Sequence, residues 1–153
     1  MAGAADLVRA LLPGPEFDLA RVVRDEEAFR ATIEASGGVI DPDVESSAPW
    51  MGEGRCYRGL EGFRSMWLDW LEPWATYHSR VEGIVEEGDR VLVLIRDRGR
   101  PHDADAEVEL VAGSVWTVRD GKIARVEFYA TREELFEATG IRPPGEARRM
   151  SGS

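Results

Sequence analysis

Three consecutive charged residues, Arg96, Asp97 and Arg98, stand directly after an apolar run over residues 91–95. Side chains alternate along a strand, so Arg96 and Arg98 share one face of the strand that this run predicts. A guanidinium is always charged and offers a planar fork of donors, so these arginines could clamp a carboxylate, enolate or phenolate at the mouth of a pocket. The alternative is that the strand leaves the core at Ile95 and its charged end forms ion pairs with nearby acidic residues.

Three other side chains could move protons. His78 lies beside apolar sequence, and an unperturbed imidazole, with a pKa of ~6.5, suits general base catalysis near pH 7. No residue at helix or strand spacing forms a dyad with it, so a hydrogen-bonded or exposed histidine is the alternative. Asp97 and Glu127 could act as acids or bases while Arg96 holds developing negative charge. Such a site would isomerise, cyclise or hydrolyse an organic molecule.

The chain contains five tryptophans among its 153 residues. Aromatic rings bury large areas, so most of them are expected in the core. One or two could face a cavity, because a ligand can supply a hydrogen-bond partner for the indole N–H. The residues that we predict to line such a pocket are Trp50, Trp116, Trp67, Tyr57 and Phe128.

Several classes of function are excluded by what the sequence lacks. It has no HExxH, P-loop, GxGxxG or GxSxG motif, and the acidic run at residues 103–107 lacks the glycine and the distal glutamate of an EF-hand. We therefore predict no metal and no cofactor. The formal charge of −10 and the pI near 4.7 disfavour nucleic acid and acidic membranes as partners. The chain has a single cysteine, Cys56, and therefore no internal disulfide. It also has no apolar stretch near 18 residues and no recognisable signal peptide. These features predict a cytoplasmic protein.

Helices and strands follow one another in an order typical of an α+β fold. Apolar residues at helical spacing predict short helices over 4–12, after Asp18 and after Asp25, which together would form one folded-back layer. A stripe rich in tryptophan predicts a helix over 59–72. The strands are expected over 81–85, 91–95, 108–118 and 123–130, and a capping box at Thr131 opens a last helix. We expect one domain over 1–141, with helices against a curved antiparallel sheet, and a disordered tail over 142–153.

Local patterns then suggest a family. Residues 57–62 (YRGLEG), 88–91 (GDRV), 115–123 (VWTVRDGKI) and the strand-to-helix segment 129–140 resemble the SnoaL-like branch of the NTF2-like superfamily. The resemblance covers about residues 18–141. It implies a cone, in which a bent antiparallel sheet and helices enclose a small-molecule pocket. It also implies a homodimer through the convex face of the sheet.

The resemblance implies site positions as well. The pocket carboxylate that some members carry on the last strand falls at Phe128 here, although a slip of one residue would place Glu127 there. A pocket histidine on the preceding strand falls at Ser114, and the carboxylate base of ketosteroid isomerases falls at Ser46 or Ser47. The Arg-x-Asp of an epoxide hydrolase becomes Arg96-Asp97-Arg98, which keeps the arginine and loses its partner.

Two hypotheses stay open at this point. In the first, the protein is an enzyme that transfers protons on a small, largely apolar organic molecule without a cofactor. In the second, it is a ligand-binding or dimerising module whose catalytic acid has been lost. The side chains that point into the cavity decide between them.

Overall fold

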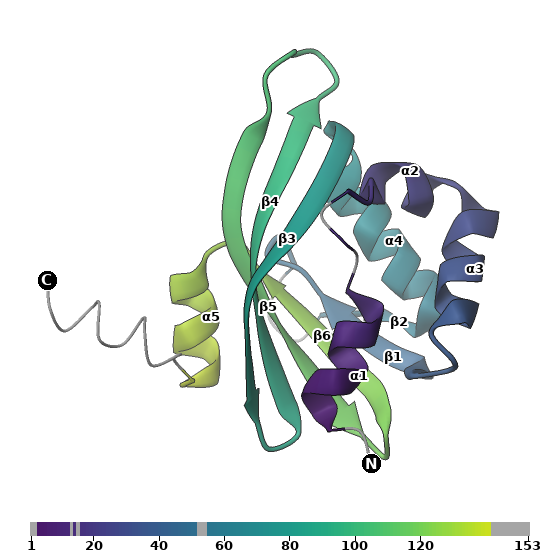
Figure 1. Cartoon of the computed structure of the whole chain (residues 1–153), viewed down its shortest axis with the longest axis vertical. Helices are drawn as coiled ribbons and strands as arrows, with labels where there is room; N and C mark the ends of the chain where they lie inside the picture. The colour runs from purple at the N-terminus through teal and green to yellow at the C-terminus, as the bar shows by residue number, and fades with distance from the viewer. Residues whose placement is uncertain (1–2, 13, 15, 52–54, 142–153) are drawn as a thin grey trace, which may run out of the picture.

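The computed structural model describes residues 3–12, 14, 16–51 and 55–141, so the predicted tail over 142–153 lies outside the described residues (Figure 1). The helices of this part of the chain are α1 (Ala4–Leu11), α2 (Leu19–Arg24), α3 (Glu26–Ala35), α4 (Gly59–Leu71) and α5 (Arg132–Thr139). The strands are β1 (Ile40–Ser47), β2 (Tyr57–Arg58), β3 (Trp74–Glu87), β4 (Arg90–Pro101), β5 (Val108–Arg119) and β6 (Lys122–Tyr129). The α+β class is confirmed.

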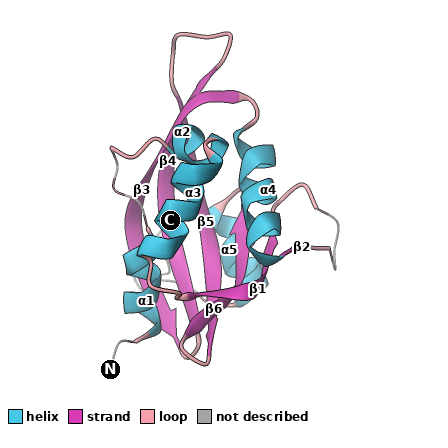
Figure 2. Cartoon of the chain, turned by 90° about the vertical axis from the view of Figure 1, so that its right-hand side faces the viewer, coloured by secondary structure: helices cyan, strands magenta, loops and turns pink. Residues whose placement is uncertain are grey.

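The strands form one curved sheet in the order β2-β1-β6-β5-β4-β3 (Figures 1 and 2). Neighbouring strands run antiparallel except β1 and β6, which run parallel. This parallel pair departs from the all-antiparallel sheet that the sequence predicts. It arises because the first strand of the chain pairs with the last one, a long-range contact that no local pattern reveals.

Strand β3 is much longer than the predicted segment 81–85. It begins at Trp74, three residues after α4 ends, and pairs with β4 up to Pro101. The stretch 76–80 looks too polar for a strand because its outward side chains, among them His78 and Arg80, are polar, while Tyr77 between them is fully buried. Strand β4 likewise extends beyond the predicted segment 91–95, since Gly99 still pairs with Tyr77.

The two faces of β4 belong to different packing layers. Val93 and Ile95 contribute to the core between the concave face and helix α4, whereas Leu92 and Leu94 pack against Leu135 of α5 on the convex face. The apolar run over 91–95 is therefore a strand covered on both faces, as its composition predicts. Figure 2 shows α2, α3 and α4 in front of the sheet and α5 behind it.

Side-chain hydrogen bonds connect the helices to one another and to β3. The guanidinium of Arg24 donates to the backbone oxygens of Leu71 and Trp74, both at 2.6 Å, where α4 ends. Asp18 accepts from the amide of Ala20 as the N-cap of α2, and the same oxygen accepts from the amide of Tyr77 at 3.1 Å. Because β3 is the last strand of the sheet, this bond joins α2 to an open edge.

Helix α1 does not join α2 and α3 in a single layer, contrary to the sequence-based expectation. It lies across the other end of the sheet and contacts β3, β4 and β6 (Figure 1). Glu86 of β3 accepts a hydrogen bond from the amide of Ala5 at 2.7 Å, and Val8 is fully buried against the sheet. The apolar side of α1 is thus covered by the sheet rather than by its neighbouring helices.

Candidate functional site

A cavity of about 320 Å³ lies between the concave face of the sheet and the helices. Helices α1 to α4 form one wall, and strands β1 and β3 to β6 form the other. No charged side chain of the described residues lines it. Its volume is within the range typical of small-molecule sites, and so is its mostly apolar lining.

Aromatic rings form the floor of the cavity. Phe128 of β6 meets Trp67 of α4 edge-on, with ring centroids 5.0 Å apart, and lies 6.4 Å from Trp116 of β5. The indole N–H of Trp116 donates to the hydroxyl of Ser114 at 2.8 Å. Four of the predicted pocket residues therefore line the cavity together: Trp67, Ser114, Trp116 and Phe128.

The placement of Phe128 also fixes the register of β6. Phe128 faces the cavity, and Glu127 beside it forms an ion pair with Arg125 at 3.2 Å and accepts from the hydroxyl of Tyr129 at 3.4 Å. Side chains of a strand alternate between its faces, so Glu127 belongs to the opposite side of the sheet. The site accordingly holds an aromatic ring at the position where the resemblance implies a carboxylate.

Asp97 is the predicted catalytic residue that the structure places on the concave side, since it alternates with Val93 and Ile95. Its side chain is 2% exposed, and its Oδ2 atom accepts a hydrogen bond from the hydroxyl of Tyr77 at 2.5 Å. Its Oδ1 atom has no partner among the described residues. Asp97 pairs across the strands with Ser79, which lines the cavity.

Burial controls the titration of this pair. It raises the pKa of Asp97 above its usual range, and the interactions with Tyr77 and Ser79 oppose the rise by favouring the carboxylate. Burial also raises the pKa of Tyr77, and the charge of Asp97 adds to the effect. The tyrosine therefore stays protonated and serves as a donor to Asp97.

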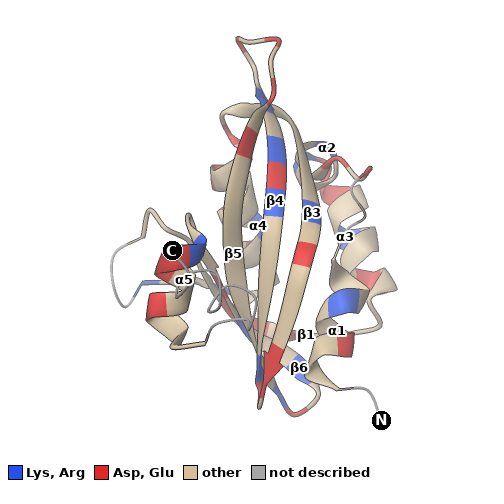
Figure 3. Ribbon diagram, turned by 60° about the vertical axis from the view of Figure 1, so that its left-hand side comes forward, with Lys and Arg blue, Asp and Glu red and all other residues tan. Residues whose placement is uncertain are grey.

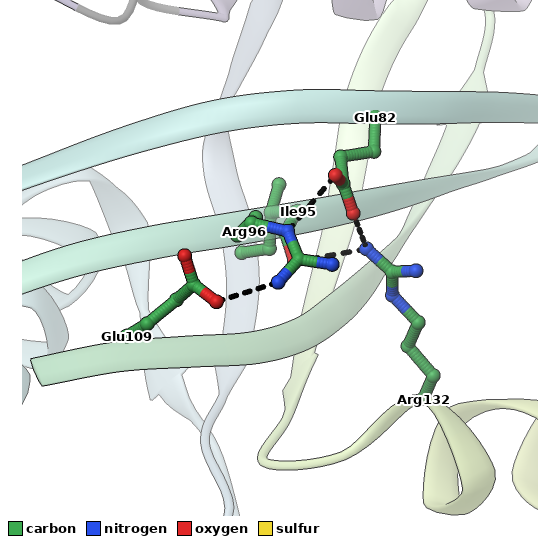
Figure 4. Close-up of polar contacts among 5 residues, drawn as sticks. All are labelled: Glu82, Ile95, Arg96, Glu109 and Arg132. Carbon is green, nitrogen blue, oxygen red and sulfur yellow. Dashed lines mark hydrogen bonds and ion pairs between the residues drawn. The ribbon is translucent and has the colours of Figure 1, made fainter.

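Arg96 lies on the convex face and not at a pocket mouth (Figure 4). It forms ion pairs with Glu82 at 2.9 Å and with Glu109 at 2.6 Å, and Glu82 also contacts Arg132 of α5. Successive side chains of β4 point to opposite faces of the sheet. Because Asp97 points to the concave side, its neighbour Arg96 points to the convex side. The alternative reading of the sequence, a charged strand end in ion pairs, describes Arg96 correctly.

Arg98 and His78 also belong to the convex face, because they alternate with inward residues of their strands. Figure 3 shows that charged residues recur along β3, β4 and β5. Arg98 forms an ion pair with Glu107 at 3.3 Å. His78 stands opposite Arg98 and alternates with the inward residues Tyr77 and Ser79, so it is separated from the cavity by the sheet. Its Nδ1 atom is buried without a hydrogen-bond partner among the described residues.

Trp50 and Tyr57 form a cluster at the surface and do not line the cavity. Trp50 is 47% exposed and stacks on Trp70, with ring centroids 5.4 Å apart. Its indole donates to the hydroxyl of Tyr57, which in turn donates to Asp69 of α4 at 2.5 Å. Trp50 follows the end of β1 and lies against Trp70 of α4, outside the cavity.

Sequence reasoning missed Ser79 and Tyr77 and the contribution of α1 to the cavity wall. The first two could have been found from the alternation of polar and apolar residues over 76–80, had that stretch been read as a strand. Among the described residues no group of His, Cys, Asp or Glu side chains gathers as a metal site would require. No helix in that part of the chain is long and apolar enough to cross a membrane.

Comparisons with known proteins agree with this geometry. The structure resembles an NTF2-like protein of unknown function from Burkholderia pseudomallei, with a TM-score of 0.60 and 19% identity over 90% of this chain and 97% of that one. It also resembles a SnoaL-like polyketide cyclase from Jannaschia sp. (TM-score 0.58, 18% identity, 90% and 93% covered). TerC, crystallised with polyporic acid, is similar at a TM-score of 0.56 and 23% identity, over 78% of this chain and 93% of TerC.

Comparison of the sequence and comparison of the structure both point to SnoaL-like proteins. No curated protein matches the chain. The family model of the SnoaL-like domain, however, matches residues 30–126, which span α4, the long strands and most of the cavity wall. The chain belongs to the SnoaL-like family.

Proposed function

We propose that the protein binds a small, largely apolar organic molecule in the cavity between the sheet and the helices. The proposal rests on one observation, the cavity of about 320 Å³ and its apolar character. Three aromatic rings form its floor, and no charged side chain of the described residues lines it. Burial of apolar ligand surface supplies the affinity in such a site. The likeness to a SnoaL-like polyketide cyclase and to TerC, which was crystallised with polyporic acid, supports a ligand of this kind.

The test uses N-phenylnaphthylamine, an uncharged fluorescent probe. Trp67 and Trp116 line the cavity, so binding is followed by energy transfer from tryptophan to the probe. Val22→Trp fills the cavity from α2 and should abolish saturable binding. Val108→Trp makes the same change at an exposed position of β5 outside the cavity and should leave it intact. Equal binding by both variants would place the probe elsewhere and overturn the proposal.

A second function, proton transfer on the bound molecule, is favoured by Asp97. This buried carboxyl has one oxygen without a partner among the described residues and lies beside Ser79 on the cavity wall. Asp97 would take a proton from the ligand, or return one, through the Ser79 hydroxyl. Arg96, His78 and Glu127 do not line the cavity, so they would not touch the bound molecule.

Nitrobenzisoxazole tests this second function, because it opens to a coloured phenolate when a base removes its ring proton. We expect a rate above the buffer background that Asp97→Asn abolishes. Glu127→Gln alters a carboxylate outside the cavity and should retain the rate. A rate equal to background, or one unaffected by Asp97→Asn, would favour the alternative of a non-catalytic binding module.

We also propose a homodimer through the convex face. Val111 of β5 is 39% exposed and stands opposite Arg96, beside the ion pair of Arg96 with Glu109 on this face. Exposed apolar side chains amid paired charges suit an interface between two copies of the chain. Sedimentation velocity should show a dimer that Val111→Glu dissociates. A monomer at all concentrations would overturn this proposal and leave ligand binding untouched.

A further inference from the structure

Two hydroxyl groups interrupt the apolar lining on the sheet side of the cavity. Ser114 of β5 and Ser79 of β3 line it, and their residues are 2% and 8% exposed. Ser114 pairs with Val93 of β4, and Ser79 pairs with Asp97 of the same strand. Four residues of β4 separate these two levels, about 13 Å of strand at ~3.3 Å per residue. The sheet side of the cavity thus has one hydroxyl group at each of two distant levels.

The hydroxyl of Ser114 is a donor that lacks an acceptor. A serine hydroxyl has one hydrogen to donate and two lone pairs. The indole of Trp116 donates to one lone pair at 2.8 Å and fixes the orientation of the group. No described residue accepts the Ser114 hydrogen. A ligand at this level is therefore bound best through an acceptor such as a carbonyl oxygen.

The other level has the opposite polarity. Tyr77 donates to Asp97 Oδ2, whereas Oδ1 has no partner among the described residues. Ser79 stands opposite Asp97 on the neighbouring strand and lines the cavity, so its hydroxyl can donate to the free Asp97 Oδ1 atom and leave its lone pairs for a ligand. A ligand at this level is bound best through a hydroxyl group that donates.

We propose that the ligand is an elongated apolar molecule with a carbonyl oxygen at the Ser114 end and a hydroxyl group at the Ser79 end. The proposal rests on ligand binding in this cavity and adds the polarity and the orientation of the bound molecule. A buried polar group without a partner costs free energy. Molecules that lack either oxygen, or that carry the hydroxyl at the Ser114 end and the carbonyl at the Ser79 end, should therefore bind with lower affinity.

Four rigid probes of about the right length test both ends separately. They are biphenyls with para substituents: acetyl and hydroxyl, acetyl alone, ethyl and hydroxyl, and ethyl alone. Affinities are measured by displacement of N-phenylnaphthylamine. We expect loss of either oxygen to weaken binding roughly three- to tenfold, the effect of one hydrogen bond.

Variants assign each oxygen to its level. Ser79→Ala should remove the benefit of the probe hydroxyl and keep that of the acetyl group. Ser114→Ala alone would leave the Trp116 indole free to donate to the ligand in place of the lost hydroxyl. Ser114→Ala is therefore combined with Trp116→Phe. The single variant Trp116→Phe is the matched control. The double variant should lose the benefit of the acetyl group only. Ser46→Ala removes a fully buried hydroxyl that does not line the cavity and should change neither affinity pattern.

The outcomes are distinct from those of the binding proposal. If all four biphenyls bind equally, or if Ser79→Ala affects the acetyl group instead of the hydroxyl, the proposed polarity is wrong while apolar binding stands. If none displaces the fluorescent probe, no ligand of this class is accepted and the inference is overturned. Thermal denaturation confirms that each variant is folded.

Discussion

Asp97 combines a buried position with incomplete hydrogen bonding. Because desolvation outweighs the contributions of Tyr77 and Ser79, its pKa is raised above the usual range. The folded protein therefore retains the Asp97 proton to a higher pH than the unfolded chain does. A carboxyl of this kind stabilises the fold at low pH and loses that contribution as it ionises.

Asp97→Asn should accordingly change how stability depends on pH. In the wild type the contribution of Asp97 to the free energy of unfolding should fall as pH rises from about 3.9, the value for an unfolded aspartate, through the raised pKa of folded Asp97. The asparagine cannot ionise, and its oxygen can still accept from Tyr77, so the variant should gain relative to the wild type across this window. Urea denaturation at a series of pH values measures the difference, with Asp105→Asn in the exposed loop as the control. A difference that is flat with pH would contradict the assignment.

The helices on the concave side depend on Arg24, which holds the end of α4 through two backbone oxygens. Arg24→Ala should lower the free energy of unfolding by about 1–2 kcal/mol, because two charge-assisted hydrogen bonds are lost. Arg21→Ala removes an exposed arginine from the same helix and should cost less than about 0.5 kcal/mol. Equal effects in chemical denaturation would show that these bonds contribute nothing specific.

Helix α5 can lie close to the convex face because Gly113 has no side chain. A Cβ atom there would be 2.5 Å from Leu135 and 3.2 Å from the backbone oxygen of Val93. Gly113→Ala should therefore destabilise the protein by about 1–3 kcal/mol. At Gly83, another strand glycine, the added atom would make an ordinary contact of 3.4 Å with Leu94. Gly83→Ala is the matched control, and denaturation midpoints that shift equally would argue against close packing at Gly113.

Sequence patterns predicted the elements better than the faces they present. The stripe of α4, the cap at Thr131 and the apolar run of β4 are local signals and were sufficient for the α+β class. Whether Arg96 or Asp97 faces the helices is decided by how the strand packs in three dimensions, and an error of one residue reverses every side chain. The same reason explains why Ser114 and Phe128 were expected in the pocket whereas Ser79 was not.

At the scale of the molecule, the cavity separates the helices from the sheet, so a ligand would bridge the two layers of the fold. A ligand that binds only the folded state stabilises it by about 2.7 kcal/mol at a hundredfold excess over Kd. For a chain of this size we expect the Tm to rise by roughly 5–10 °C. Differential scanning fluorimetry is obscured by the naphthylamine probe, so circular dichroism is the suitable measurement. Val22→Trp should show no rise, and an equal rise in that variant would indicate binding outside the cavity.

The open edge of β3 has a consequence for colloidal behaviour. An unpaired strand edge of 14 residues is a template on which another chain can add a strand and begin an aggregate. Here the hydrogen bond from Tyr77 to Asp18, the irregular pairing between Val81 and Gly83, and the charge of Glu82 all interrupt that template. Detachment of α2 would remove the first of these barriers and expose the backbone of β3 at Tyr77 to strand addition while the rest of the sheet stays paired.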